Sequence, residues 1–321
     1  MKMLVTGGAG FIGRWTVKKL LEEEHSIWIL DDLSNGSYDN IKEFESCGLA
    51  KFIHGDIKDE RLLENIFAED FDMCFHLAAK ITVQDSIDDP VTTYRNDVGG
   101  TFNVLEQCRK HGTKMIFMST CMVYDRASGE KGIDELHPVK PASPYAGSKI
   151  AGENLVLSYW HAYKLPVVVI RPFNTYGPFQ KSGGEGGVIA IFISKSLEGK
   201  ALEIFGDGNQ TRDFLYVEDC ADFIVRAGCS DKAVGQIINA GTGKDIRIND
   251  LAVLIGRDRS PIEHVPHIHP QSEIQKLLCN SEKAYRLLSW RPQTVIEEGI
   301  AITEKWIAAI KKNRFYDDIN N

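Results

Sequence analysis

Thr6-Gly7-Gly8-Ala9-Gly10-Phe11-Ile12-Gly13 is the stretch that decides the fold of this chain. It follows a short apolar run, Met3-Leu4-Val5, and precedes an amphipathic stretch from Arg14 to Glu24. A strand, a glycine-rich turn and a helix in this order are typical of a dinucleotide-binding unit. A glycine-rich turn without a ligand is the alternative, and the order of the flanking elements argues against it.

Each glycine of this turn has a separate task. Gly7 allows the tight turn, Gly10 lets the backbone approach a pyrophosphate, and Gly13 lets helix and strand pack closely. The N–H groups at the start of the helix would face the phosphates. The cofactor contacts expected from this stretch are Gly7, Gly10, Phe11, Ile12 and Gly13.

Two acidic residues, Asp31 and Asp32, follow the next predicted strand, Ser26 to Leu30. At this distance from the glycine turn a carboxylate meets the adenosine ribose hydroxyls of a dinucleotide. A carboxylate here favours NAD and repels the extra phosphate of NADP. No arginine follows in Leu33-Ser34-Asn35-Gly36-Ser37. The sequence therefore predicts NAD, although Asp32 could also be an ordinary turn residue.

Strands alternate with helical stretches through the first half of the chain, and this pattern predicts a mostly parallel sheet with helices on both faces. Helical periodicity is clearest in Thr101 to Arg109 and Tyr145 to Tyr163. The predicted strands are Lys2 to Val5, Ser26 to Leu30, Lys51 to His54, Met73 to Leu77, Lys114 to Ser119 and Val167 to Arg171. The expected fold is α/β, a Rossmann-type doubly wound parallel sheet with a smaller C-terminal α/β lobe.

Tyr145 and Lys149 lie four residues apart, so on a helix both side chains project from one face. An ammonium close to a phenol stabilises the phenolate and lowers the tyrosine pKa from roughly 10 toward neutrality. Such a tyrosine can take the proton of a sugar hydroxyl while a hydride leaves its carbon. The spacing is weak on its own, because Tyr and Lys fall four apart on many solvated helices.

Further motifs occur in a fixed order along nearly the whole chain. They are Gly55-Asp56-Ile57, His76-Leu77-Ala78-Ala79, Asn96 before Asp97-Val98-Gly99-Gly100-Thr101, Ser119-Thr120, Arg171-Pro172-Phe173-Asn174-Thr175-Tyr176-Gly177-Pro178, Phe205-Gly206-Asp207-Gly208 and Gln210-Thr211-Arg212-Asp213-Phe214. With the glycine turn and the Tyr-Lys pair, this set resembles the NAD-dependent nucleotide-sugar epimerase/dehydratase family of extended short-chain dehydrogenases.

The resemblance implies an enzyme that oxidises C4 of a nucleotide-diphosphate sugar, a UDP-sugar being favoured. Tyr145 would remove the hydroxyl proton, Thr120 would orient that oxygen, and Lys149 would keep Tyr145 reactive and bond the nicotinamide ribose. NAD would stay tightly bound and be recycled. The cofactor contacts implied in addition are Asp56, Ile57, Leu77, Ala78, Ala79, Tyr145 and Lys149, and the substrate contacts are Asn174, Val188, Arg212 and His269.

Thr120-Cys121-Met122 separates the reactions of this family. Familiar dehydratases carry Thr-Asp-Glu here, whereas Met122 accepts no proton and Cys121 is a weak acid with a pKa of about 8.5. Ordinary dehydration and decarboxylation are therefore disfavoured, and a 4-epimerase is slightly preferred. A dehydratase with Cys121 as the acid stays open, because a few unusual dehydratases have Thr-Cys here and Ser272 to Leu278 resembles a dehydratase stretch. Cys121 could also simply be a buried packing residue.

Substrate anchoring follows from charge, since a diphosphate needs cationic or N–H donors. Arg212 is the best candidate, and Asn174 would lie beside the sugar or the diphosphate. Family members usually carry a second arginine where this chain reads His267-Ile268-His269-Pro270, so His269 is its candidate replacement. The three histidines 264, 267 and 269 are too loosely spaced for a predicted metal site, and no metal is expected.

Composition excludes several function classes for the 321 residues. The net charge of −8 disfavours a nucleic-acid surface, and no apolar run approaches the length of a membrane span. Seven cysteines without a CxxC pair indicate free thiols in a reducing cytoplasm. The first predicted strand begins almost at Met1, which leaves no room for a signal peptide. A catalytically dead NAD-binding sensor is a remote alternative to the enzyme.

The expected domain division places residues 1–172 and about 211–240 in the NAD-binding part, and residues 173–210 and 241–321 in the nucleotide-sugar lobe. The glycine-rich stretch 182–187 would be a loop between the two or one that closes over substrate. Helices near Val98 to Lys110 and Tyr145 to His161 carry apolar stripes. By the resemblance, they would form a homodimer through a four-helix bundle, although both stripes could simply pack on the sheet.

Overall fold

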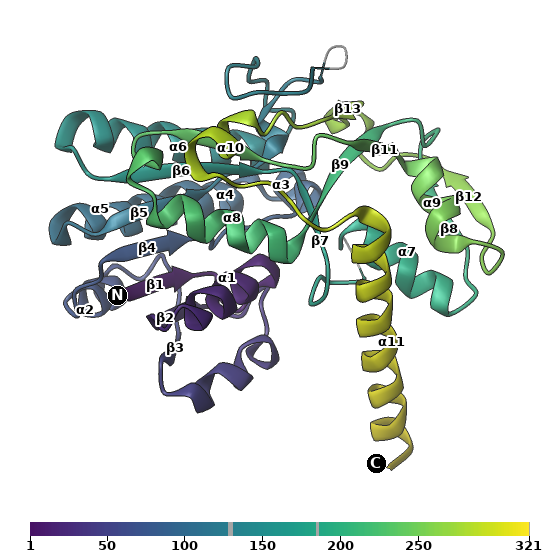
Figure 1. Ribbon diagram of the computed structural model, residues 1–321, viewed down its shortest axis with the longest axis horizontal. Helices are drawn as coiled ribbons and strands as arrows, with labels where there is room; N and C mark the ends of the chain where they lie inside the picture. Colours follow the sequence, from purple (N-terminus) through teal and green to yellow (C-terminus); the bar gives the residue numbers. More distant parts are fainter. Residues whose placement is uncertain (128–130, 184–185, 321) are drawn as a thin grey trace.

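Seven parallel strands form the central sheet of the computed structural model, which describes residues 1–127, 131–183 and 186–320 (Figure 1). Their spatial order is β10-β6-β5-β4-β1-β2-β3. The strands are β1 (Lys2–Thr6), β2 (Ser26–Asp31), β3 (Ala50–His54), β4 (Met73–His76), β5 (Lys114–Met118), β6 (Val167–Pro172) and β10 (Ile237–Ala240). The first six have the doubly wound order 3-2-1-4-5-6, which opens a crevice where the order reverses between β1 and β4.

The predicted fold class is confirmed, and all six predicted strands are present with ends that differ by one residue at most. The predicted helices are also present, as α5 (Thr101–His111) and α6 (Pro144–Tyr163). The seventh strand, β10, was not predicted. This strand pairs with β6 at the edge of the sheet and packs against α10 (Glu282–Leu288), a helix that follows much later in the sequence.

Helices cover both faces of the sheet because the strand residues alternate between two apolar clusters. Met3 and Val5 pack in the cluster that holds the buried side chains of α1 and α8, whereas Leu4 packs in the cluster of α2, α5 and α6. The helices not yet bounded are α1 (Phe11–Glu22), α2 (Glu60–Phe67) and α8 (Val217–Cys229). A strand buried on both faces reads as a continuous apolar run, and this is why the strands were predictable.

A smaller lobe lies beside the C-terminal edge of this sheet, to the right in Figure 1. It has its own apolar cluster, to which Phe192, Phe214 and Leu251 contribute. One of its sheets joins β7 (Asn174–Tyr176), β9 (Thr211–Tyr216), β11 (Asp245–Arg247) and β13 (Lys276–Leu277), and the other joins β8 (Leu202–Phe205) to β12 (Ile262–Val265). Its helices are α7 (Val188–Leu197), α9 (Ile248–Gly256) and α11 (Ile296–Asn320).

Residues 211–240 connect the two parts. The helix α8 packs beside α1 and β10 joins the main sheet, whereas β9 pairs with strands of the lobe. The chain therefore crosses between the parts several times, and the exact domain boundaries stay a prediction. Of the predicted loop 182–187, Gly184 and Glu185 lie outside the described residues.

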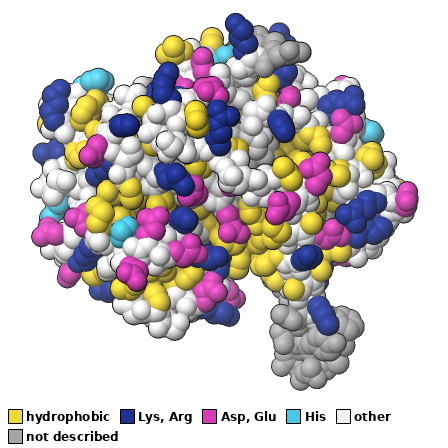
Figure 2. Space-filling model, in the orientation of Figure 1, with side chains coloured by type: hydrophobic (Ala, Val, Ile, Leu, Met, Phe, Trp, Pro, Cys, Tyr) yellow, Lys and Arg dark blue, Asp and Glu magenta, His cyan; other side chains and the backbone are white. Residues whose placement is uncertain are grey.

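The described surface agrees with the composition. On the face in Figure 2, Lys and Arg side chains are interspersed with Asp and Glu. Every helix among the described residues is too short or too polar to cross a membrane. All seven cysteines lie in the described part of the chain and are free thiols.

One buried ion pair joins the longest helix of the main domain to the sheet. Glu153 on α6 pairs with Arg171 on β6, and both side chains are only 3% exposed. Arg171 Nε donates to Glu153 Oε1 at 2.8 Å, and the hydroxyl of Ser119, just after β5, donates to the same oxygen. The guanidinium also lies 4.6 Å from the centre of the Tyr124 ring. These contacts fix α6 against the ends of two neighbouring strands.

Glu153→Gln is expected to lower the free energy of unfolding by about 3–5 kcal/mol, because it leaves the buried charge of Arg171 uncompensated. Urea denaturation of the purified protein measures this loss. Glu22→Gln is the matched control, since Glu22 makes an exposed pair with Lys18 that contributes about 0.5 kcal/mol or less. Equal losses in the two variants would contradict the structural importance of the buried pair.

Candidate active site

A cavity of about 300 Å³ opens at the carboxyl ends of the strands, at the crevice between β1 and β4. Segments that are far apart in the sequence line it together. They include Gly7, Gly10 to Gly13, Asp31, Asp32, Gly55 to Ile57, Leu77 to Ala79, Ser119 to Met122, Tyr145, Lys149 and Pro172 to Thr175. All predicted cofactor contacts and catalytic residues, together with Asn174, are thus brought to one cavity.

The glycine turn has no room for side chains. Gly7 has a φ of +72°, and a Cβ built on it would lie 2.6 Å from the backbone nitrogen of Ala78. A Cβ on Gly13 would lie 2.1 Å from the carbonyl oxygen of Gly7. The turn, the start of α1 and the segment after β4 therefore approach one another with bare backbone at the floor of the cavity. This is the cradle that a pyrophosphate requires.

The two aspartates at the end of β2 have different environments. Asp31 is buried, and its carboxylate accepts the N–H groups of Ala9 and Leu33, both at 2.9 Å. Burial raises the pKa of Asp31. Asp32 is more accessible and accepts the N–H of Ser34 at 2.9 Å. Burial alone would raise the pKa of Asp32, but the hydrogen bonds from Ser34 together with the charges of Lys80 and Lys58 outweigh it and lower the pKa.

The catalytic candidates meet at the start of α6. Ser143 caps this helix by accepting the N–H of Ala146 at 3.2 Å, and Pro144 occupies its first turn. The first turn therefore points Tyr145 into the cavity, where Lys149 and the end of β5 also lie. Lys149 Nζ donates to the carbonyl oxygen of Met118 at 2.9 Å.

Burial governs the electrostatics of this pair. It raises the pKa of Tyr145 and lowers the pKa of Lys149, since in both cases the charged form is disfavoured away from water. A hydrogen bond with Thr120 acts against the rise at Tyr145. The predicted activation of Tyr145 by Lys149 stays a prediction.

Cys121 and Met122 also line the cavity, next to Thr120. The Cys121 side chain is 2% exposed, and burial raises the pKa of its thiol to about 12. The thiol is therefore neutral near pH 7, and it is a much weaker acid than a free cysteine or a carboxylic acid.

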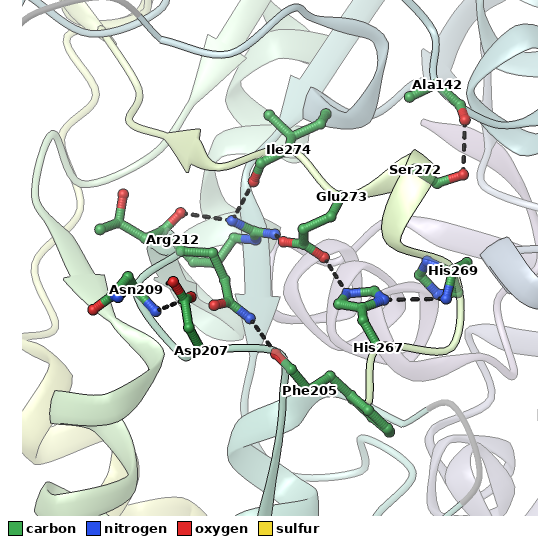
Figure 3. Close-up of polar contacts among 12 residues, drawn as sticks. Ala142, Phe205, Asp207, Asn209, Arg212, His267, His269, Ser272, Glu273 and Ile274 are labelled. Atoms are coloured by element: carbon green, nitrogen blue, oxygen red, sulfur yellow. Dashed lines mark hydrogen bonds and ion pairs between the residues drawn. The ribbon is translucent and has the colours of Figure 1, made fainter. Parts of the chain in front are cut away.

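Arg212 and His269 do not line the cavity but belong to a polar cluster in the lobe (Figure 3). The guanidinium of Arg212 donates to the carboxylate of Glu273 and, at 2.7 Å, to the carbonyl oxygen of Ile274. Glu273 also contacts His267 Nε2 at 2.7 Å. In the described structure Nδ1 of His269 is buried without a hydrogen-bond partner. Glu273 and His267 were not identified as site residues from the sequence.

Among the described residues that line the cavity, two have a side-chain oxygen that is buried without a hydrogen-bond partner, Oδ1 of Asn174 and Oε1 of Gln180. Both residues line the cavity, so these atoms are available to a bound molecule. Gln180 was missed because no motif marks it. Asn35 and Gly36, which also line the cavity, follow Asp32 closely and could have been inferred from that position. Val188 begins α7 and does not line the cavity.

In the described part of the chain, one group of three metal-ligating side chains has its ligand atoms within 4.8 Å of one another. It consists of Glu23, His25 and Cys229. None of these residues lines the cavity, and the histidines 264, 267 and 269 form no such group in the described chain.

Comparison with known proteins gives consistent matches. The model of the NAD dependent epimerase/dehydratase family matches residues 3–241. The X-ray structure of Pal from Bacillus thuringiensis is 64% identical, covers 97% of this chain and 100% of its own, and has a TM-score of 0.95. UDP-glucose 4-epimerase of Mycolicibacterium smegmatis is 38% identical over 94% of this chain and 97% of its own. dTDP-glucose 4,6-dehydratase of Shigella flexneri is 30% identical over 96% of this chain and 93% of its own.

Asp32→Ala is expected to weaken NAD binding and to narrow the ratio between the dissociation constants for NADP and NAD, because a repelling carboxylate is removed. Titration calorimetry with both cofactors measures the ratio. Asp39→Ala is the control, since Asp39 is exposed and does not line the cavity. An unchanged ratio in Asp32→Ala would assign cofactor discrimination to Asp31 or to the loop that follows.

Proposed function

Because the chain belongs to the NAD-dependent epimerase/dehydratase family, we propose that it is a UDP-sugar 4-epimerase that works through a transient 4-keto sugar. The cofactor is NAD, which when bound would supply the hydride acceptor and donor for C4 of the sugar. The substrate is a UDP-hexose or a UDP-N-acetylhexosamine. This proposal combines the family with the side chains present at the end of β5.

The observation that carries the epimerase assignment is the missing carboxylate at the end of β5. Dehydration requires a base for the C5 proton and an acid for the hydroxyl that leaves C6. Met122 can supply neither, and the Cys121 thiol is a very weak acid. The acidic residues in the described cavity lining are Asp31 at the end of β2, Asp32 just after it and Asp56 after β3, where the adenosine is expected.

Epimerisation needs only the groups that are present. Tyr145 takes the proton of the C4 hydroxyl as hydride leaves C4, and Thr120 orients that oxygen by a hydrogen bond. Lys149 stabilises the phenolate by its charge. After the keto sugar has rotated in the site, Tyr145 returns the proton to the C4 oxygen as hydride arrives on the opposite face of C4. Atoms and electrons balance, since nothing leaves the sugar.

Sequence identity alone does not choose the reaction, since relatives at 30–38% identity include both a 4,6-dehydratase and a 4-epimerase. The dehydratase alternative would have to use Cys121 as the acid. The raised pKa of that thiol makes it a poor proton donor, and this disfavours the alternative. A catalytically inactive sensor is disfavoured by the intact set of Tyr145, Lys149 and Thr120 in one cavity.

We further propose that the diphosphate of the substrate is held in the lobe by Arg212, with Asn174 and His269 as neighbours. The unpartnered Nδ1 of His269 supports this role, because it donates a hydrogen bond when it carries the proton. The unpartnered Oδ1 of Asn174 is an acceptor, so it would meet a hydroxyl group of the sugar and not a phosphate oxygen. Val188, at the start of α7, is proposed to contact the sugar. Since Glu273 pairs with Arg212 in this structure, the incoming diphosphate must share or replace that contact.

A homodimer through α5 and α6 is also proposed. Large apolar side chains are exposed on these helices and on the neighbouring α4 (Pro90–Tyr94). Tyr94 is 62% exposed, Phe102 43% and Tyr163 58%. Apolar side chains grouped on neighbouring helices favour association with a second copy, which would bury them. The free thiols support the proposed cytoplasmic location.

The purified protein, incubated with UDP-glucose and with UDP-N-acetylglucosamine, is expected to yield a product of unchanged mass but changed C4 configuration. Mass spectrometry and NMR of the product test this. Tyr145→Phe is expected to retain the fold and lose about 10²–10⁴-fold in rate. A product that has lost one water would replace the epimerase proposal with the dehydratase, and no turnover or cofactor reduction with a wide panel of nucleotide sugars would favour the sensor.

Phe102→Asp is expected to give a monomer in light scattering, because a charge is placed in the proposed helical interface. Val253→Asp is the matched control, since Val253 is 62% exposed on α9 in the other lobe. A wild-type monomer, or a dimer that survives Phe102→Asp unchanged, would contradict this interface.

A further inference from the structure

Asp97 is a buried carboxylate that the proposed reaction does not use. It lies in η3 (Arg95–Gly100), a single π-helical turn that leads into α5, and only 2% of it is exposed. It does not line the cavity. Removing an ionised carboxylate from water is costly unless other groups bond it, so its neighbours indicate what it does.

The carboxylate of Asp97 joins the catalytic helix to the segment that lines the cavity after β4. Oδ1 accepts the backbone N–H of Lys80 at 2.8 Å and the amide N–H of Asn96 at 3.1 Å. The hydroxyl of Ser148 lies 3.0 Å from Oδ2 and 2.8 Å from the carbonyl oxygen of Tyr145, so it can donate to either. Ser148 immediately precedes Lys149, and Lys80 immediately follows Leu77 to Ala79, so one carboxylate holds both parts of the site.

The charge of Asp97 also acts on the reacting pair. Burial raises the pKa of Tyr145, and Asp97 is the next largest cause in the same direction. Burial lowers the pKa of Lys149, and Asp97 is the largest influence that opposes this. A negative charge thus disfavours loss of the proton from both groups.

Among the described residues, the other titratable groups that act on the pair are a thiol, a carboxylate paired with an arginine, and a histidine. Cys121, from the turn after β5, is a neutral thiol whose pKa is raised by burial. Glu153, on α6 itself, also opposes the fall in the pKa of Lys149, but less than Asp97 does, and it is paired with Arg171 of β6. His76, at the end of β4, is neutral because burial and then the charge of Lys149 lower its pKa to about 3.

Two hydroxyl groups are also partners of Tyr145. Ser86 on α3 (Val83–Asp88) accepts the N–H of Tyr145 at 3.1 Å. Thr120 forms a hydrogen bond with the phenol. Among the groups named here, Asp97 is therefore the one carboxylate near Tyr145 and Lys149 that is not paired with an arginine.

We propose that Asp97 is a positioning residue that holds α6 against the cofactor segment and whose charge sets the pH range in which Tyr145 and Lys149 work. This inference rests on the proposed function for its kinetic readout. The rate rises as Tyr145 loses its proton and falls as Lys149 loses its own. Both limbs depend on the same neighbouring charge, so they must move together when that charge is removed.

Asp97→Asn is the direct test, since it removes the charge and preserves the size of the side chain. Both limbs of the pH profile of kcat/KM are expected to move to lower pH, by roughly one unit. Ser148→Ala is the matched control, because it loosens the helix without changing any charge. It is expected to lower kcat with both limbs in place. Unmoved limbs in folded Asp97→Asn, or an equal movement in Ser148→Ala, would overturn the proposal.

Two further measurements cover the other outcomes. If Asp97→Asn does not fold, Asp97→Glu, which keeps the charge, is expected to retain the wild-type limbs of the pH profile. A shift of a unit or more would overturn the proposal.

If no nucleotide sugar is turned over, the proposed function fails separately. Tyr145 ionisation is then read without substrate, as the ultraviolet difference between the NAD-loaded protein and its Tyr145→Phe variant. The Asp97→Asn substitution must lower the pH of that transition, and an unchanged transition would overturn the role of Asp97.

Discussion

The buried ion pair between Glu153 and Arg171 is the interaction on which the geometry of the active site depends. It lies two turns along α6 from Tyr145. It links the helix to β6 through Arg171 and to Ser119, the residue that precedes Thr120. A helix that merely packed on the sheet by apolar contacts could slide along it, because such contacts have little directionality. Charged hydrogen bonds have strict geometry. They hold Tyr145 and Lys149 in register with the strand end that carries Thr120.

The same region shows how a parallel sheet concentrates function. All seven strands point the same way, so their carboxyl ends form one edge, and the segments that leave this edge meet there. The glycine turn, the two aspartates and the catalytic helix come together for this reason. Arg212 and His269 belong to a polar cluster in the lobe (Figure 3), and neither residue lines the cavity in this structure.

The sequence predicted the main sheet well, because each doubly buried strand is an apolar run and each important turn is a contiguous motif. It predicted the lobe poorly, since β7, β11 and β13 are only two or three residues long and carry no periodic pattern. The sequence indicated Arg212 but not Glu273, its partner from 61 residues further along the chain. Asp97 lies in one of the sequence motifs, but the motif indicates no role for it. Its role depends on contacts with Ser148 and Lys80, which only the folded chain brings close to it. Cys121 was recognised, whereas the weakness of its thiol as an acid follows from burial that the sequence does not display.

The end of β5 has an evolutionary consequence. Cys121 and Met122 lie in the cavity lining, one and two residues beyond Thr120, while the contacts that hold the sheet and α6 together involve Ser119, Glu153 and Arg171. Under the proposed function, substitutions at these two positions would change which bonds of the keto sugar are broken without disturbing the contacts that hold α6 against the sheet. A lineage with this architecture can exchange one sugar chemistry for another in very few steps. Neighbours in sequence space can then differ in product while they share cofactor, fold and first reaction step.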